Sequence, residues 1–217
     1  MRLRADGVET RKRILNAACE VFAARGYKDA TVAHICRRAR ANSAAINHHF
    51  TNKQSLYTEV WRHLAAEAMR LYPVHGGVAS NAPARKRLRG FLVSLLQRAT
   101  DRGQLGAFHR LRMLEMASPT GLIDRVRWEA IRPMREYIHL LLKELLGDDV
   151  SEQELSYCEL QLIGPCLMAQ LISQQPRMPV APFPPVDAES FADHCTEFVL
   201  AGLKSIRARN NSSKGEA

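Results

Sequence analysis

Apolar residues recur at helical spacing along most of the chain, and no stretch alternates between apolar and polar positions as a half-buried strand would. The first apolar stripe consists of Ile14, Leu15, Ala18, Val21 and Phe22. Their spacings of one, three and four residues place them on one face of a helix. We expect this helix to begin at Thr10 or earlier and to end at Gly26, with Tyr27 packing back onto the stripe.

A second helix, about two turns long, is predicted directly after Thr31, whose hydroxyl is suited to cap it. Its apolar residues are Val32, Ile35, Cys36 and Ala39. Their spacing turns them toward the first helix. The helix ends at the turn Arg40-Ala41, which makes this segment the first half of a helix-turn-helix.

The second half is a short helix that follows a polar cap at Asn42. Ile46 and Phe50 lie four residues apart and are expected to point inward. The residues left facing outward are Ser43, Ala44, Ala45, Asn47 and His48. Because these side chains are small near the start of the helix, the helix can lie deep in a DNA major groove, which is about 12 Å wide.

The distribution of charge also points to DNA. The chain has a formal charge of +9, and residues 1–56, with eleven Lys or Arg against four Asp or Glu, hold +7 of it. A basic segment followed by a nearly neutral body is typical of a phosphate-binding module joined to a globular domain. A basic helix lying on an anionic membrane is an alternative, but the clustering of charge around a capped helix-turn-helix favours DNA.

The remaining chain is predicted to be helical, so the fold class is all-α. The expected helices run from 56 to 71, 84 to 100, 104 to 117, 120 to 146 with an interruption at Pro133, 151 to 175 and 187 to 207. Gly164-Pro165 should kink the second-last helix, and the proline-rich segment 176–185 should form an extended connector. We expect a DNA-binding domain over 8–68, a second helical domain over 69–208 and a disordered tail over 209–217.

The sequence contains little that suggests an enzyme, a metal site or a membrane protein. The five cysteines include no C-x-x-C pair, and no G-x-S-x-G, P-loop, dinucleotide-binding or H-E-x-x-H motif occurs. No apolar run approaches the roughly 20 residues needed to span a bilayer, and the chain opens with charged residues rather than a signal-peptide core. We therefore expect a cytoplasmic protein that is not an enzyme and has no cofactor, metal or membrane partner.

The pattern of the first fifty or so residues resembles the TetR family of transcriptional repressors. The matching positions are Thr10-Arg11, Ile14-Leu15, Ala17-Ala18, Phe22, Gly26-Tyr27, Thr31-Val32, Ile35, Ala39, Asn42, His49-Phe50, Lys53 and Leu56. Further stretches resemble the CecR-type subgroup: Ala44 to Phe50, Glu115 to Thr120, Ile131-Arg132-Pro133, Cys158 and Ile163-Gly164. The chain departs from the family pattern at Arg40 and Ala44, where glycine is common, and at His48, where an aromatic residue is usual.

The resemblance implies a double-stranded DNA operator as partner and assigns roles to the residues that match it. Thr31, Asn42, His49 and Lys53 would hold phosphates. Ser43, Ala44, Ala45, Asn47 and His48 would face bases, with Asn47 suited to pair bidentately with adenine. Arg40 would compensate for the missing glycine by reaching a phosphate.

The resemblance also implies a homodimer formed through about 151–175 and 187–207. The apolar residues expected there are Leu155, Cys158, Leu162, Ile163, Cys166, Leu167, Phe191, Cys195, Phe198, Val199 and Ile206. A symmetry argument supports a dimer independently, because two recognition helices related by a dyad read a palindrome with half-sites roughly 34 to 36 Å apart.

By resemblance, the middle helices enclose a cavity for a small-molecule effector. The expected contacts are Phe108, Arg112, Glu115, Met116, Trp128, Tyr137 and Met168. Two plainer interpretations stay open: methionine and aromatic stripes usually form ordinary core, and Arg112 and Glu115 have the spacing of a surface ion pair. The sequence thus predicts a homodimeric, ligand-responsive repressor of a palindromic operator. The alternative is a ligand-independent DNA-organising or partner-binding protein that uses its C-terminal domain only to dimerise.

Overall fold

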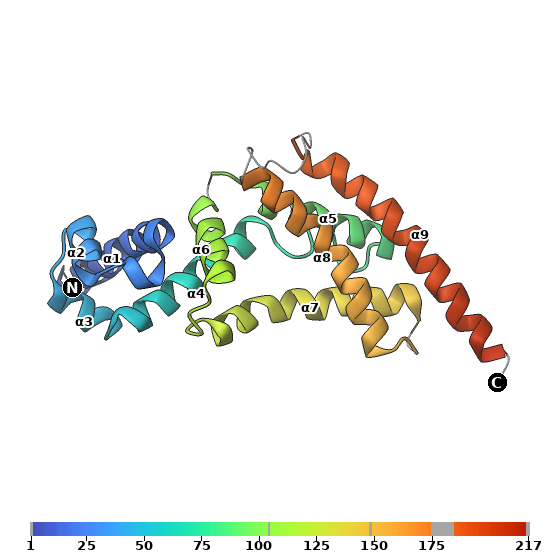
Figure 1. Cartoon of the computed structure of the whole chain (residues 1–217), viewed down its shortest axis with the longest axis horizontal. Coiled ribbons are helices and arrows are strands. Elements are labelled where there is room, and N and C mark those ends of the chain that lie inside the picture. Colours follow the sequence, from blue (N-terminus) through green and yellow to red (C-terminus); the bar gives the residue numbers. More distant parts are fainter. Residues whose placement is uncertain (1, 104, 148, 175–184, 216–217) are drawn as a thin grey trace. The chain divides into compact units, whose positions relative to one another are not determined.

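A computed structural model describes residues 2–103, 105–147, 149–174 and 185–215 of the chain (Figure 1). These ranges contain nine helices and no strand, which confirms the all-α fold class. The helices are α1 (Arg2–Asp29), α2 (Val32–Ala39), α3 (Ser43–Phe50), α4 (Lys53–Leu71), α5 (Ala84–Thr100), α6 (Gly106–Ala117), α7 (Asp124–Leu146), α8 (Glu152–Gln174) and α9 (Ala188–Gly215).

The chain divides into two compact units. Unit 1 comprises Met1–Glu67 and Gly103–Ala130, and unit 2 comprises Ala68–Arg102 and Ile131–Ala217. The boundary at Glu67 lies next to the one expected from the sequence, but the segment 103–130 belongs with the helix-turn-helix. The reason is that α6 packs against α1, a contact between distant segments that local periodicity does not encode.

The core of unit 1 is built around the apolar stripe of α1. Ile14 and Phe22 are fully buried, and the Phe22 ring meets the Tyr57 ring edge-on with centroids 4.9 Å apart. Gly26 leaves the helical conformation at φ 70° and ψ 179°, which a glycine tolerates without strain. This bend returns Tyr27 to the stripe, 6.3 Å from Phe22 and 4.9 Å from Tyr57, as the sequence predicts.

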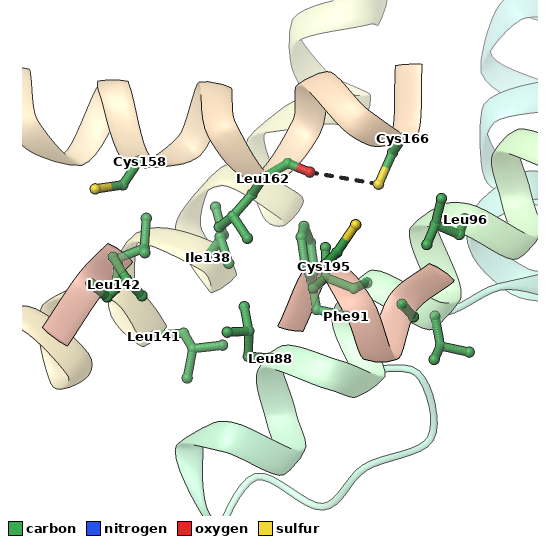
Figure 2. Packing of buried hydrophobic residues seen from close by; sticks show 14 of the residues in the cluster. Leu88, Phe91, Leu96, Ile138, Leu141, Leu142, Cys158, Leu162, Cys166 and Cys195 are labelled. Carbon is green, nitrogen blue, oxygen red and sulfur yellow. Dashed lines mark hydrogen bonds between the residues drawn. The ribbon is translucent and has the colours of Figure 1, made fainter. Parts of the chain in front are cut away.

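The core of unit 2 joins α5, α7, α8 and α9 (Figure 2). Leu88 and Leu96 of α5 and Ile138 of α7 are fully buried in it. Leu162 and Cys166 of α8 face the same core, and the Cys166 thiol donates a hydrogen bond to the Leu162 carbonyl at 3.6 Å.

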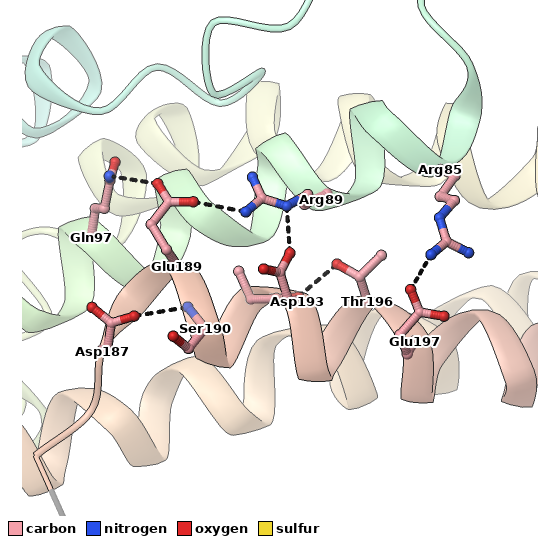
Figure 3. A network of polar contacts seen from close by, with 10 residues as sticks. Arg85, Arg89, Gln97, Asp187, Glu189, Ser190, Asp193, Thr196 and Glu197 are labelled. Carbon is pink, nitrogen blue, oxygen red and sulfur yellow. Dashed lines mark hydrogen bonds and ion pairs between the residues drawn. The ribbon is translucent and has the colours of Figure 1, made fainter.

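Polar contacts along the outside of this core link α9 to α5 (Figure 3). The Arg89 guanidinium pairs with Asp193 and, at 2.9 Å, with Glu189, and one turn away Arg85 pairs with Glu197. These side chains are 42–63% exposed, so each pair contributes little, about 0–1 kcal/mol. The alignment of the two helices therefore depends mainly on the apolar core that they share, and the ion pairs add little to it.

Several expectations about helix ends and interruptions need correction. Pro133 lies inside α7, which runs from Asp124 to Leu146 without the interruption expected there. Helix α8 contains Gly164-Pro165, as the sequence predicts, and the kink expected there stays a prediction. Helix α9 runs to Gly215, where a disordered tail from 209 was expected, and within this segment Arg209 pairs with Glu154 at 3.0 Å. The connector expected over 176–185 lies outside the described residues except at Pro185.

Candidate nucleic-acid interface

Helix α3 presents a narrow face of small and polar side chains. Ser43, Ala44, Asn47 and His48 are exposed, and Ala45 is half-buried. On the opposite side Ile46 and Phe50 are 0% and 3% exposed, as the sequence predicts. Packing of these two residues into unit 1 therefore determines which side chains of α3 remain available to a partner.

Side-chain caps define the beginnings of α2 and α3. The Asn42 Oδ1 accepts a hydrogen bond from the Ala45 amide at 2.8 Å, and the Thr31 Oγ1 accepts one from the His34 amide at 3.1 Å. His34 returns the contact, because its Nδ1 accepts from the Thr31 amide at 3.4 Å. Each cap satisfies one of the four amide donors that a helix start leaves open, so others remain for an anion.

The turn between α2 and α3 depends on Arg40 in the left-handed conformation, at φ 49° and ψ 49°. From this position its amide donates to the Arg37 carbonyl at 3.4 Å, and the Ala41 amide donates to the Cys36 carbonyl at 3.0 Å. A residue other than glycine here costs on the order of 1 kcal/mol. The Arg40 side chain is exposed and forms no ion pair with a described residue, so its charge is available.

Lys53, at the first position of α4, is held in place by its neighbours. Its ammonium lies 4.4 Å from the centre of the Tyr27 ring and donates to the Lys28 carbonyl at 3.5 Å. Burial lowers the pKa of Lys53, and the nearby Asp29 carboxylate partly opposes that shift. These two contacts hold the ammonium at the start of α4.

His49 is half-buried at the end of α3. Burial lowers its pKa, and the neighbouring His48 and Arg11 lower it further because a second positive charge there is unfavourable. Arg11 lies 4.9 Å from the centre of the Phe50 ring and pairs with Glu59 at 3.0 Å. His49 is therefore largely neutral at neutral pH in the free protein.

Some basic residues of this region form ion pairs with described residues, and others do not. Arg38 is committed to Glu20, with its Nε 2.6 Å from the carboxylate. Arg37, one position earlier on α2, is exposed and pairs with no described residue. The sequence prediction omitted Arg37 because a count of charges does not separate paired from unpaired cations. The sequence feature that could have identified Arg37 is its position three residues before Arg40, near the end of α2.

Two family models match this chain. The model of the N-terminal domain of the tetR family of bacterial regulatory proteins matches residues 14–60, which cover the capped helices described above. The model of the C-terminal domain of the HTH-type transcriptional dual regulator CecR matches residues 84–203, more than half of the chain. The chain belongs to the TetR family, with a C-terminal domain of the CecR type.

Relatives agree with this membership, and a solved structure shares the fold. The HTH-type transcriptional regulator SrpR of Pseudomonas putida is 29% identical over 139 residues, which cover 64% of this chain but only 62% of SrpR. TtgW of the same species, also an HTH-type transcriptional regulator, is 28% identical over 134 residues, which cover 62% of this chain and 95% of TtgW. The transcriptional regulator FadR of Bacillus subtilis, solved with stearoyl-CoA, shares the fold, with a TM-score of 0.64 over 88% of this chain and 98% of FadR at 16% identity.

In this TetR-family protein, three of the expected effector contacts share one stripe of α6. Phe108 is buried and packs edge-on against Trp61 with centroids 5.7 Å apart, and the Arg112 guanidinium lies 5.7 Å from the Phe108 ring centre. Glu115 is buried and accepts a hydrogen bond from the Tyr57 hydroxyl at 2.5 Å. The alternative of a surface ion pair between Arg112 and Glu115 is therefore wrong.

The other four expected effector contacts are placed differently. Met116 and Trp128 of unit 1 are 55% and 52% exposed. In unit 2, Tyr137 stacks on Phe91 at 6.1 Å, and its buried hydroxyl finds no hydrogen-bond partner among the described residues. Met168 is 49% exposed. The effector site thus remains a prediction, with the α6 stripe as its most buried part.

The apolar residues of α8 and α9 divide into an inner and an outer set. Leu155, Cys158, Leu162, Cys166 and Cys195 were expected at a dimer interface but are buried in the unit 2 core. Phe198 of α9, also expected there, is 73% exposed, and Tyr157, Leu160 and Met168 of α8, which were not expected there, are 55%, 66% and 49% exposed. A groove of about 600 Å³ between these helices is lined by Tyr157 and Phe198 among others. Periodicity alone did not separate the buried face of α8 from its exposed face, because large apolar residues occur on both faces.

Proposed function

We propose that this TetR-family transcriptional regulator is a homodimeric repressor, released from a palindromic operator by a small, largely apolar molecule. The observation that carries its DNA-binding part is the outward face of α3, which carries small side chains near its start and is flanked by the unpaired cations Arg37 and Arg40. Such a face fits a major groove, and cations beside it suit the phosphates that border the groove.

We assign the individual contacts by chemistry. Thr31, Asn42, Lys53 and His49 hold phosphates, because each lies at a helix end or carries a donor beside one. Ser43, Ala44, Ala45, Asn47 and His48 face the bases, and Asn47 reads adenine. Arg40, and with it Arg37, reaches the phosphates beside the recognition helix.

The composition of α8 supports dimerisation. Within the described chain, the segment Glu152–Ser173 is long and apolar enough, by those measures alone, to cross a membrane, contrary to the sequence expectation. Its inner face packs in the unit 2 core, whereas Tyr157, Leu160 and Met168 remain exposed on the outer face. Large apolar side chains gathered on an exposed face mark a surface that a partner covers. A second copy of α8 and α9 supplies that cover in a cytoplasmic protein.

Release by an effector requires differential affinity. The ligand must bind more tightly to a form of the dimer whose recognition helices are wrongly spaced for two successive grooves. A coupling of about 1 to 3 kcal/mol suffices for release by several-fold to a hundredfold. The buried, polar stripe of α6 is where we place the effector contacts Phe108, Arg112 and Glu115.

Genome-wide mapping of bound DNA, followed by gel-shift titration of the recovered site, tests this function. We expect a palindrome with half-sites about 10 base pairs apart, two chains per site, and affinity that falls steeply with salt. A bound motif without two-fold symmetry, or stronger binding to anionic vesicles than to duplex DNA, would contradict it. If no compound in a broad library changes operator affinity, the ligand-independent alternative holds instead.

A further inference from the structure

Helix α6 carries two ionisable side chains on a stripe that faces inward. Phe108, Arg112 and Glu115 follow one another at spacings of four and three residues, so they lie on the same side of the helix. Phe108 and Glu115 are 8% and 6% exposed, and Arg112 is partly buried between them. Charged groups in such a position are ordinarily paired, since removal from water is costly for an unpaired charge.

Glu115 has its own partners. Its Oε1 accepts from the Tyr57 hydroxyl at 2.5 Å and from the Thr120 hydroxyl at 2.8 Å, and its Oε2 accepts from the Thr120 amide at 3.1 Å. Three donors occupy most of the accepting capacity of a carboxylate. Glu115 therefore ties α6 to α4 and to the loop after α6, and it does not neutralise Arg112.

Arg112 has no such partner. Its guanidinium lies over the Phe108 ring, 5.7 Å from the centre, and it forms no hydrogen bond or ion pair with any described residue. Burial lowers its pKa, as expected for a cation without a compensating anion. An aromatic face attracts a cation but offers no acceptor for the five donors of the guanidinium.

We propose that Arg112 binds the carboxylate of the effector, whose apolar part packs in the same region as Phe108. A guanidinium and a carboxylate form two parallel, charge-assisted hydrogen bonds, which satisfy the donors that the fold leaves open. A neutral apolar effector would bury the cation further without compensating it. This inference rests on the proposed ligand response and narrows its ligand to an organic carboxylate.

The stability of the ligand-free protein provides the first test. Arg112→Met keeps an unbranched apolar stem like that of arginine and removes the unpaired charge, so we expect the full-length protein to melt about 2–4 °C higher. Arg110→Met is the matched control, because Arg110 lies on the same helix and is exposed. Its melting temperature should not change. A lower or unchanged melting temperature for Arg112→Met would mean that Arg112 is a structural residue, and would overturn the proposal.

Binding provides the second test, with two pairs of probes that differ only in charge: decanoate against decanol, and naphthoate against naphthylmethanol. Calorimetric titration of the wild-type dimer should show at least one carboxylate binding about tenfold or more tightly than its alcohol. Arg112→Met should lose that advantage, Arg112→Lys should keep part of it, and Arg110→Met should keep all of it. Equal affinities within both pairs, binding of neither carboxylate, or an unaffected Arg112→Met would overturn the assignment.

Operator binding separates this proposal from the proposed function. If the carboxylate binds through Arg112 but leaves operator affinity unchanged, the effector-released repressor is wrong and the anion site stands. If the operator is released by alcohols as well as by carboxylates, the repressor stands and the role of Arg112 is wrong.

Discussion

Helix α3 and the pair α8–α9 both present side chains that their own units do not use, but the two sets are chemically opposite. On α3 the exposed residues are small or polar, such as Ser43 and Asn47. On α8 and α9 they are large and apolar, such as Leu160 and Phe198, at 66% and 73% exposed. Leaving a large apolar side chain in water forfeits about 1.5–3 kcal/mol, whereas a polar one costs nothing. The comparison suggests a permanent partner for α8–α9 and a transient one for α3.

The largest effect should follow from placing a charge on the outer face of α8. Leu160→Glu should convert the dimer to a monomer and weaken operator binding by about a hundredfold or more, because one recognition helix then binds alone. Light scattering after size exclusion measures the first result, and a gel shift the second. Leu140→Glu is a matched control, since Leu140 is 71% exposed on α7, outside this face. If both variants stay dimeric, the face assignment is wrong.

A smaller effect, on the free energy of unfolding, should follow from loss of the hydrogen bond between Tyr57 and Glu115. Tyr57→Phe removes one donor from the buried Glu115 carboxylate, so we expect a loss of about 1–3 kcal/mol in the free energy of unfolding. Denaturant titration measures it. Tyr27→Phe is the matched control, because the Tyr27 ring lies beside Tyr57 but its hydroxyl forms no hydrogen bond with a described residue, and it should change the free energy of unfolding by less than about 0.5 kcal/mol. Equal losses in the two variants would argue against the Tyr57–Glu115 link.

Arg40→Gly should change stability and DNA binding in opposite directions. Glycine relieves the left-handed conformation at φ 49° and should gain about 1 kcal/mol of stability. The loss of one phosphate contact should weaken binding to specific and random DNA alike and reduce the salt dependence by about one ion. Thermal melting and salt titration are the measurements. Unchanged DNA affinity would exclude Arg40 from the interface.

The smallest effect concerns pH. The pKa of His49 is lowered in the free protein, and a phosphate beside it would raise that pKa in the complex. Operator affinity should therefore increase by about threefold to tenfold as the pH falls through the pKa of the complex, and level off below the pKa of the free protein. His49→Gln should flatten the profile, and His63→Gln should not. A wild-type profile that is already flat would remove His49 from the phosphate contacts.

The same two regions differ in how well the sequence predicts them. Around α3 the signals are local: the caps Thr31 and Asn42, the inward pair Ile46 and Phe50, and the left-handed turn at Arg40 all depend on residues within a few positions. In α8, periodicity finds the helix but not its inner face, because both faces are apolar. Which one is buried depends on packing against α5, far away in the sequence.

For the α6 stripe, the suggested ion pair between Arg112 and Glu115 was wrong for a different reason. Its spacing was visible, and so were its charged residues, but the partner of Glu115 is Tyr57, 58 positions earlier in the chain. The spacing of three residues suggested Arg112 as the ion-pair partner of Glu115 instead. Long-range hydrogen bonds are not encoded by local spacing, and this one leaves Arg112 unpaired.

The central claim is that α3 reads sequence while the residues around it hold phosphates. The most direct measurement compares wild type and Asn47→Ala on the mapped operator and on random duplex DNA of equal length, at one salt concentration. We predict that Asn47→Ala loses about 1–3 kcal/mol of discrimination on the operator and nothing on random DNA, whereas Arg37→Ala weakens both equally. Equal weakening of Asn47→Ala on both DNAs would contradict the claim.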